Sequence, residues 1–116
     1  ALILITHDLG VVARYADRVA VMYAGRIVET APARDLYADP QHPYTVGLMA
    51  SIPGIDGDAG SRLTTIDGQP PDLANLPGGC AFAPRCPYAR EVCRDAAPPL
   101  ESVSDAHLRA CYGFES

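Results

Sequence analysis

The sequence contains no apolar run approaching the roughly 18 residues that a membrane-crossing helix requires. Its first residues also lack the basic region and the small-residue cleavage site of a secretory signal peptide. Basic residues are few, since 9 Lys and Arg stand against 14 Asp and Glu for a formal net charge of −5. A nucleic-acid-binding surface needs clustered positive charge, so we expect no nucleic acid among the partners. These absences predict a cytosolic chain.

The length of the chain, 116 residues, allows one modest hydrophobic core. Proline and glycine, at 11 and 10 residues, fall mostly after residue 53, which predicts a second half rich in loops. The first residue is Ala1, and the chain opens directly in the apolar run ALILIT. We therefore expect it to be a fragment of a longer protein.

The first third of the chain alternates between strand and helix patterns. Residues 1–6 are continuously apolar, which is typical of a strand buried on both faces of a parallel sheet. Residues 7–17 show apolar side chains at helical spacing. The β-branched stretches on either side of Ala24 and Gly25 predict a β-hairpin with a tight turn.

Two short helices are predicted next, over residues 31–39 and 41–53, the second with Pro43 in its first turn. Residues 54–79 are punctuated by Gly, Pro, Asp and Asn and predict a linker, with one short strand at 63–66. A segment of this length without regular structure is uncommon unless something else fixes it, and the cysteines that follow are the obvious candidate.

A histidine, His7, follows the first predicted strand at the sheet edge where α/β proteins usually bind ligands. The run LILITHDLGVVARYADRVAVMYAGRIVETAP resembles the end of the nucleotide-binding domain of ABC transporters. The resemblance implies an α/β fold, namely the C-terminal fragment of a P-loop NTPase (ABC) domain followed by a loop-rich, Cys-containing C-terminal extension. It also implies that His7 is the switch histidine, which contacts the terminal phosphate of ATP and helps hold the attacking water. Asp8 serves equally well as a helix cap.

The other ATP-binding motifs of that family are missing from the sequence. It contains no GxxxxGKS/T phosphate loop, no Walker B strand and no LSGGQ-like stretch. Without the backbone that cradles the phosphates and the ligands of Mg²⁺, one histidine cannot hydrolyse ATP. We therefore expect ATP and Mg²⁺ to bind only to a parent subunit, and this chain alone to be inactive.

The segment DPQHPYT, residues 39–45, resembles the oligopeptide and dipeptide branch of ABC ATPases, which nickel importers share. This resemblance implies an importer subunit that couples ATP hydrolysis to transport, peripheral on the cytoplasmic face of the inner membrane. The implied partners are a second ATP-binding subunit, transmembrane permease subunits and, through the complex, a peptide-binding protein. From the residues alone, we interpret His42, Pro43 and Tyr44 as a helix start with a packed aromatic ring.

Four cysteines, Cys80, Cys86, Cys93 and Cys111, are separated by five, six and seventeen residues. Disulfides seldom persist in a reducing cytosol, so we place them last. Structural zinc sites usually contain cysteine pairs two to four residues apart, and no such pair occurs here. An iron–sulfur cluster is larger than one ion, so it tolerates wider spacing. Zinc remains the alternative.

The pattern GC.F..RCP.A...C, followed by a late cysteine, resembles the C-terminal extension of peptide-transporter ATPases, some of which carry a four-iron four-sulfur cluster. The resemblance implies that all four cysteines are its ligands. Nearby arginines would stabilise the negatively charged cluster, although for Arg90 and Arg94 we prefer the interpretation as a solvated basic face. His107 stays outside the predicted site.

These observations predict two parts. Residues 1–38 form the end of the nucleotide-binding domain, and residues 39–116 form the extension with the four-cysteine site. The alternative is a stand-alone metal-binding or iron–sulfur interaction module, in which His7 has no role.

Overall fold

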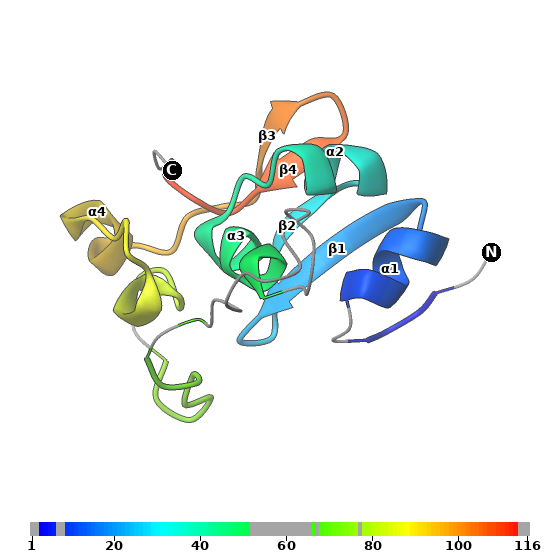
Figure 1. Cartoon of the computed structure of the whole chain (residues 1–116). Helices are drawn as coiled ribbons and strands as arrows, with labels where there is room; N and C mark the ends of the chain where they lie inside the picture. The colour runs from blue at the N-terminus through cyan, green and yellow to red at the C-terminus, as the bar shows by residue number, and fades with distance from the viewer. Residues whose placement is uncertain (1–2, 7–8, 52–65, 67, 77, 114–116) are drawn as a thin grey trace.

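The computed structural model describes residues 3–6, 9–51, 66, 68–76 and 78–113. Its helices and strands are α1 (Leu9–Tyr15), β1 (Arg18–Tyr23), β2 (Arg26–Pro32), α2 (Ala33–Ala38), α3 (Pro43–Ala50), the 3-10 helix η1 (Ala83–Arg85), α4 (Glu91–Asp95), β3 (Glu101–Ser104) and β4 (His107–Arg109). The strands form one antiparallel sheet in the order β1-β2-β4-β3 (Figure 1).

The hairpin of β1 and β2 carries much of the core. Side chains alternate between exposed and buried along β1, which places Val19, Val21 and Tyr23 in the interior. Ala24 and Gly25 form the turn with φ angles of 53° and 79°, the left-handed pair that matches the twist of adjoining strands. The predicted hairpin is confirmed.

The predicted helices are also present as α1, α2 and α3. Leu36 of α2 is fully buried against the hairpin. The Tyr37 hydroxyl donates to the Leu9 carbonyl at 2.6 Å, which ties α2 to the start of α1. His42 caps the N-terminus of α3 and Pro43 occupies its first turn, as the sequence predicted.

The predicted strand at the start of the chain is not observed. Residues 3–6 are described and form no strand, and the side chains of Ile3 and Ile5 are 87% and 92% exposed. A parallel strand needs hydrogen-bonding neighbours on the sheet, and the sheet observed here is entirely antiparallel. The strand predicted at 63–66 falls almost wholly outside the described residues, and Ile66 itself lies in no strand.

The sheet is completed by two strands that the sequence did not predict. β4 pairs with β2 through Glu29 opposite Arg109 and Thr30 opposite Leu108, and β3 forms the edge beside β4. Strands from both sides of residue 38 thus belong to one sheet, while the division into parts at that residue stays a prediction.

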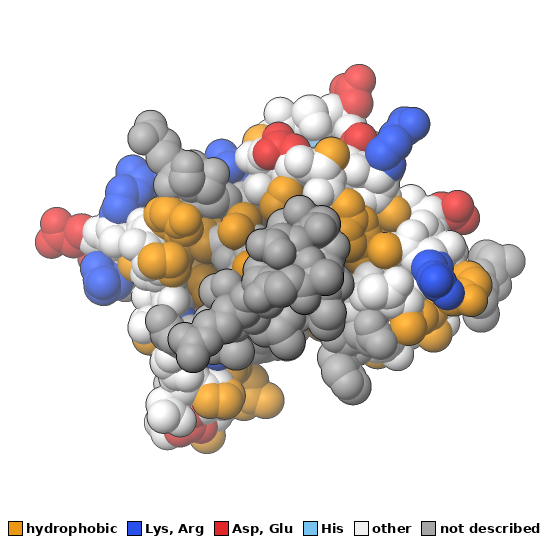
Figure 2. All heavy atoms as spheres, viewed as in Figure 1, with side chains coloured by type: hydrophobic (Ala, Val, Ile, Leu, Met, Phe, Trp, Pro, Cys, Tyr) orange, Lys and Arg blue, Asp and Glu red, His pale blue; other side chains and the backbone are white. Residues whose placement is uncertain are grey.

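The core lies between the hairpin, α2, α3 and Phe82, and the segment of η1 and α4 extends from one end of the sheet, opposite α1 (Figure 1). Figure 2 shows hydrophobic side chains gathered on the viewed face, with charged side chains mainly around its rim. No helix within the described ranges is long and apolar enough to cross a bilayer.

Candidate cysteine and histidine site

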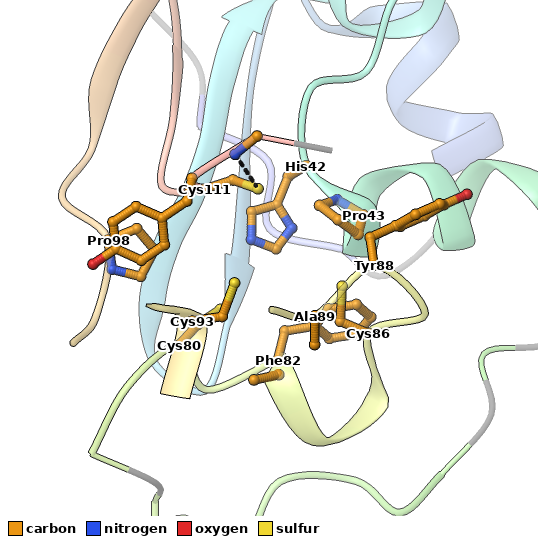
Figure 3. Close-up of a pocket in the computed structure, with 13 residues that line it drawn as sticks. His42, Pro43, Cys80, Phe82, Cys86, Tyr88, Ala89, Cys93, Pro98 and Cys111 are labelled. Carbon is orange, nitrogen blue, oxygen red and sulfur yellow. Dashed lines mark hydrogen bonds between the residues drawn. The ribbon is translucent and has the colours of Figure 1, made fainter. Parts of the chain in front are cut away.

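The structure brings the four cysteines together around one cavity (Figure 3). Cys80 and Cys86 flank η1, Cys93 lies in α4, and Cys111 follows β4. All four are free thiols and half-buried. The remaining lining is largely apolar and aromatic; it consists of His42, Pro43, Phe82, Ala83, Tyr88, Ala89, Pro98, Tyr112 and Gly113. Three separate stretches of the chain therefore contribute thiols to one place.

A close backbone contact holds two of these stretches together. The Cys80 amide donates to the Cys93 carbonyl at 2.7 Å. Gly79 permits this approach, since a Cβ there would lie 2.2 Å from the Cys93 oxygen and 2.8 Å from Arg94 Cα. A side chain at position 79 cannot fit without moving the backbone of α4.

The pKa values of three of the four thiols are raised, mainly because the thiols are partly buried. Burial raises the pKa of Cys80, Cys86 and Cys111, and the neighbouring cysteines raise it further because thiolates would repel one another. A bound cation or cluster would offset this repulsion.

Backbone N–H groups act in the opposite direction on the same sulfurs. The amides of Phe82 and Tyr88 lower the pKa of Cys80 and Cys86, respectively. The Gly113 amide donates to Cys111 Sγ at 3.3 Å (Figure 3). The Arg90 amide likewise donates to Cys93 Sγ, at 3.5 Å. Each sulfur is therefore approached by at least one N–H donor, and donors of this kind also support metal-bound thiolates.

The cavity among the thiols is small, about 20 Å³, which is room for one water molecule. Within the described part of the chain, no three His, Cys, Asp or Glu side chains lie close enough together to hold a single metal ion. The thiols thus surround a common space at separations wider than one ion requires.

His42 enters the same cavity from the start of α3 (Figure 3). Its Nδ1 accepts a hydrogen bond from the Tyr44 amide at 3.0 Å, and its ring lies 5.9 Å from that of Phe82. The pKa of His42 is lowered to about 4, mainly by burial and in addition by the Arg109 cation, while the Ala110 carbonyl partly opposes both. The imidazole is therefore neutral at pH 7.

Glu29 organises the backbone behind His42. Its carboxylate is fully buried and accepts from the Gln41 and His42 amides at 2.7 and 3.0 Å. His107 Nε2 of β4 lies 2.5 Å from the same carboxylate. One acidic side chain of β2 thus fixes both the entry to α3 and the last strand of the sheet.

Comparison with known proteins places these features in a family. Residues 28–93 match the family described as oligopeptide/dipeptide transporter, C-terminal region. This match covers more than half of the chain, from β2 through the third cysteine. The chain belongs to this family. The resemblance inferred from residues 39–45 and from the cysteine pattern is thereby confirmed.

Relatives of this transporter C-terminal region are named as ATP-binding transport proteins. The chain is 54% identical over 112 residues to the oligopeptide transport ATP-binding protein OppD of Salmonella typhimurium, covering 97% of this chain and 33% of that protein. The like-named protein of Mycobacterium tuberculosis is 54% identical over 113 residues, covering 97% and 18%. That of Escherichia coli is 52% identical over 112 residues, covering 97% and 33%. The chain therefore spans a third or less of these relatives.

Arginines of the transporter C-terminal region bond to structural partners. Arg90 donates to the Tyr112 carbonyl at 2.9 Å, and Arg109 donates to Gln41 Oε1 at 3.1 Å. Both cations lower the pKa of Cys111. Arg90 and Arg94 are both exposed, but Arg90 also has specific partners that the solvated basic face suggested by the sequence did not include.

One predicted site residue falls outside the described structure, and two residues that the structure places at the site were not predicted. His7 and Asp8 lie outside the described residues, so the predicted phosphate contact stays a prediction. The sequence missed the roles of His42 and Glu29 in the site. The HPYT segment did signal a helix start, but nothing in it indicated that the imidazole would face the cysteines.

Proposed function

We propose that this chain is the C-terminal portion of the ATP-binding subunit of an ABC importer for oligopeptides or dipeptides. The main support is the family match over residues 28–93. Relatives of the chain are themselves named as oligopeptide transport ATP-binding proteins, which supports the same function. ATP with Mg²⁺ would bind to motifs that this sequence does not contain. The subunit would work with permease subunits, a second ATP-binding subunit and a peptide-binding protein at the inner face of the membrane.

His7 is the residue of this chain that we assign to ATP hydrolysis. Its position after an apolar run resembles the switch histidine of the family, which donates to the terminal phosphate. Phosphoryl transfer depends mainly on positioning and charge stabilisation, so one donor can carry a large part of the rate. The chain on its own would have no measurable activity.

Replacing His7 by Ala in the complete transporter should lower ATP hydrolysis about 10²-fold or more, the usual cost of losing one transition-state donor. ATP affinity should change little, since the phosphate loop supplies most of the binding. Hydrolysis and nucleotide binding would be measured on the reconstituted complex. A wild-type rate in the variant would remove His7 from the mechanism.

We further propose that the four cysteines hold a four-iron four-sulfur cluster, with zinc as the alternative. The residues fit such a group in kind, because four thiols from three stretches line one cavity and backbone donors face their sulfurs. Since the cavity is about 20 Å³, the thiol side chains would turn outward to admit a cluster. Such a cluster supplies inorganic cross-links and a one-electron couple. We assign it a structural or regulatory role.

Metal analysis tests this assignment. Protein purified without oxygen should be brown and contain about four iron and four sulfide per chain. Cys86→Ser should lose the cluster and become sensitive to protease around η1 and α4. A colourless protein with one zinc per chain would favour the alternative, and a metal-free native protein would refute both.

The stand-alone metal-binding module gains no support from the relatives, all of which carry names of ATP-binding transport proteins. A reading frame that continues upstream into a GxxxxGKS/T motif would decide for the transporter subunit.

A further inference from the structure

The hydrogen bonding of His42 determines where its proton lies. Nδ1 accepts from the Tyr44 amide, so it carries no hydrogen, and the neutral ring must bear its proton on Nε2. Nε2 is fully buried and has no hydrogen-bond partner among the described residues. The side chain as a whole is 1% exposed. His42 therefore presents a buried N–H donor that no described residue satisfies.

An unsatisfied buried donor is costly, by roughly 1–3 kcal/mol, and native structures seldom retain one without a reason. The Ala110 carbonyl is the backbone acceptor that acts on this ring, but it does not form a hydrogen bond of normal geometry with Nε2. The cavity that the ring enters is lined otherwise by apolar side chains and the four thiols, and the nearby Arg109 is a cation that cannot accept a hydrogen bond. In Figure 3 the imidazole projects toward the space between the sulfurs of Cys111, Cys93 and Cys86. The acceptor that fits this donor is thus a negatively charged sulfur.

We propose that His42 Nε2–H donates a hydrogen bond to a sulfur of the cluster held by the four cysteines, and thereby raises its reduction potential. This inference rests on the proposed cluster. Donors to cluster sulfurs favour the reduced form, which carries one more negative charge, and so make the potential more positive. His42 is a positioning residue here, with Glu29 fixing its backbone amide and Tyr44 fixing its tautomer.

Two substitutions separate the two nitrogens of the ring. His42→Asn keeps an acceptor at the position of Nδ1, so the cap of α3 is retained while the donor is lost. His42→Gln reaches the position of Nε2 with an amide N–H, so the donor is retained while the cap is lost. Thr45→Val is the matched control, because Thr45 is also fully buried with an unpartnered hydroxyl but does not line the cavity.

The reduction potential of the complete native chain and its variants would be measured by anaerobic titration followed by electron paramagnetic resonance. At a fixed potential, His42→Asn should lower the ratio of reduced to oxidised cluster about tenfold, which is a shift of 59 mV for one electron. His42→Gln should keep most of the wild-type potential despite a less stable fold, and Thr45→Val should keep all of it.

A measurement on the wild type covers the case in which the variants fail to hold the cluster. With ¹⁵N-labelled histidine, the reduced cluster should show a hyperfine coupling to one imidazole nitrogen. Absence of this coupling, or an unchanged potential in His42→Asn, would overturn the inference and indicate that Nε2 pairs with Ala110. Absence of iron and sulfide from the native protein would instead refute the proposed cluster itself, and the inference would fall with it.

Discussion

At the scale of single residues, Glu29 is the buried side chain that links strand β2 to the start of α3 and to strand β4. It is an acidic residue with no exposed surface in the middle of a strand, where it accepts two backbone N–H groups and contacts one imidazole. A buried charge is tolerated only when it is paired and fully hydrogen-bonded. The carboxylate therefore fixes the relative positions of β2, β4 and the start of α3.

Glu29→Gln should be strongly destabilising. The amide would turn one N–H donor toward the donors of Gln41, His42 or His107, leaving a buried group unpaired, at a cost of about 3–5 kcal/mol. The free energy of unfolding would be measured by chemical denaturation. Glu101→Gln in the exposed strand β3 is the control and should change stability by less than about 0.5 kcal/mol. Equal stabilities for the two variants would show that the Glu29 network contributes nothing.

The sequence could not indicate this residue or His42. Glutamate is almost always exposed, and its place between Val28 and Thr30 looks like the polar position of an alternating strand. His42 did indicate a helix start, and this was confirmed. Its second nitrogen becomes significant only through contacts with residues far away in the chain.

At the scale of elements, the hairpin and the short helices were predictable because their signals are local. Alternating β-branched residues around Ala24 and Gly25, and prolines in the first helical turn, determine these elements within a few residues. β3 and β4 are only four and three residues long, and β3 is exposed throughout. Such strands have no periodic apolar pattern, since β4 forms by pairing with β2 and β3 by pairing with β4 rather than by burying a face.

Gly79 is the element-scale position that is most sensitive to substitution. Gly79→Ala places a methyl group against the backbone of Cys93 and Arg94, which should cost about 1–3 kcal/mol and loosen the contact between Cys80 and α4. Stability to denaturant and iron content would both be measured, and both should fall.

Gly78→Ala is the matched control, because a Cβ at this position meets nothing within 4 Å. It should remain within about 0.5 kcal/mol of wild type with its iron unchanged. If the two variants behaved alike, the close approach at Gly79 would have no role in assembling the site.

At the scale of the whole molecule, strands from the first third of the chain and from its last part form one sheet. Leu108 of β4 sits between Thr30 on one side and Ser102 on the other. Val103, by contrast, lies in a bulge of the edge strand, where the pairing passes from Ser102 to Ser104. Proline is tolerated at bulges and edges but not inside a sheet.

Leu108→Pro should therefore destabilise the fold by roughly 3 kcal/mol, while Val103→Pro should be tolerated. Hydrogen exchange would be followed at the amides of β1 and β2, far from both substitutions in sequence. Faster exchange in that hairpin is expected only for Leu108→Pro. Unchanged exchange there would mean that the hairpin is stable without β4.

The gathering of the four cysteines was foreseen from their number and spacing, but nothing in the sequence indicated that the apolar start of the chain would lie exposed at residues 3–6. A continuous apolar run has the same sequence pattern whether it forms a strand or remains unpaired, because only the presence of neighbouring strands distinguishes the two cases. Local patterns carry no information about them.

The pairing of Glu29 with His107 spans 78 positions, and this has a consequence for biosynthesis. At roughly 5–20 residues added per second, a ribosome needs about 4–16 s to reach the imidazole after it has placed the carboxylate. During that interval β2 has no β4 beside it, and the nascent hairpin depends on solvent or chaperones to cover its open edge. Cys111 follows His107 by four positions, so the four thiols can gather only after the whole site has been translated.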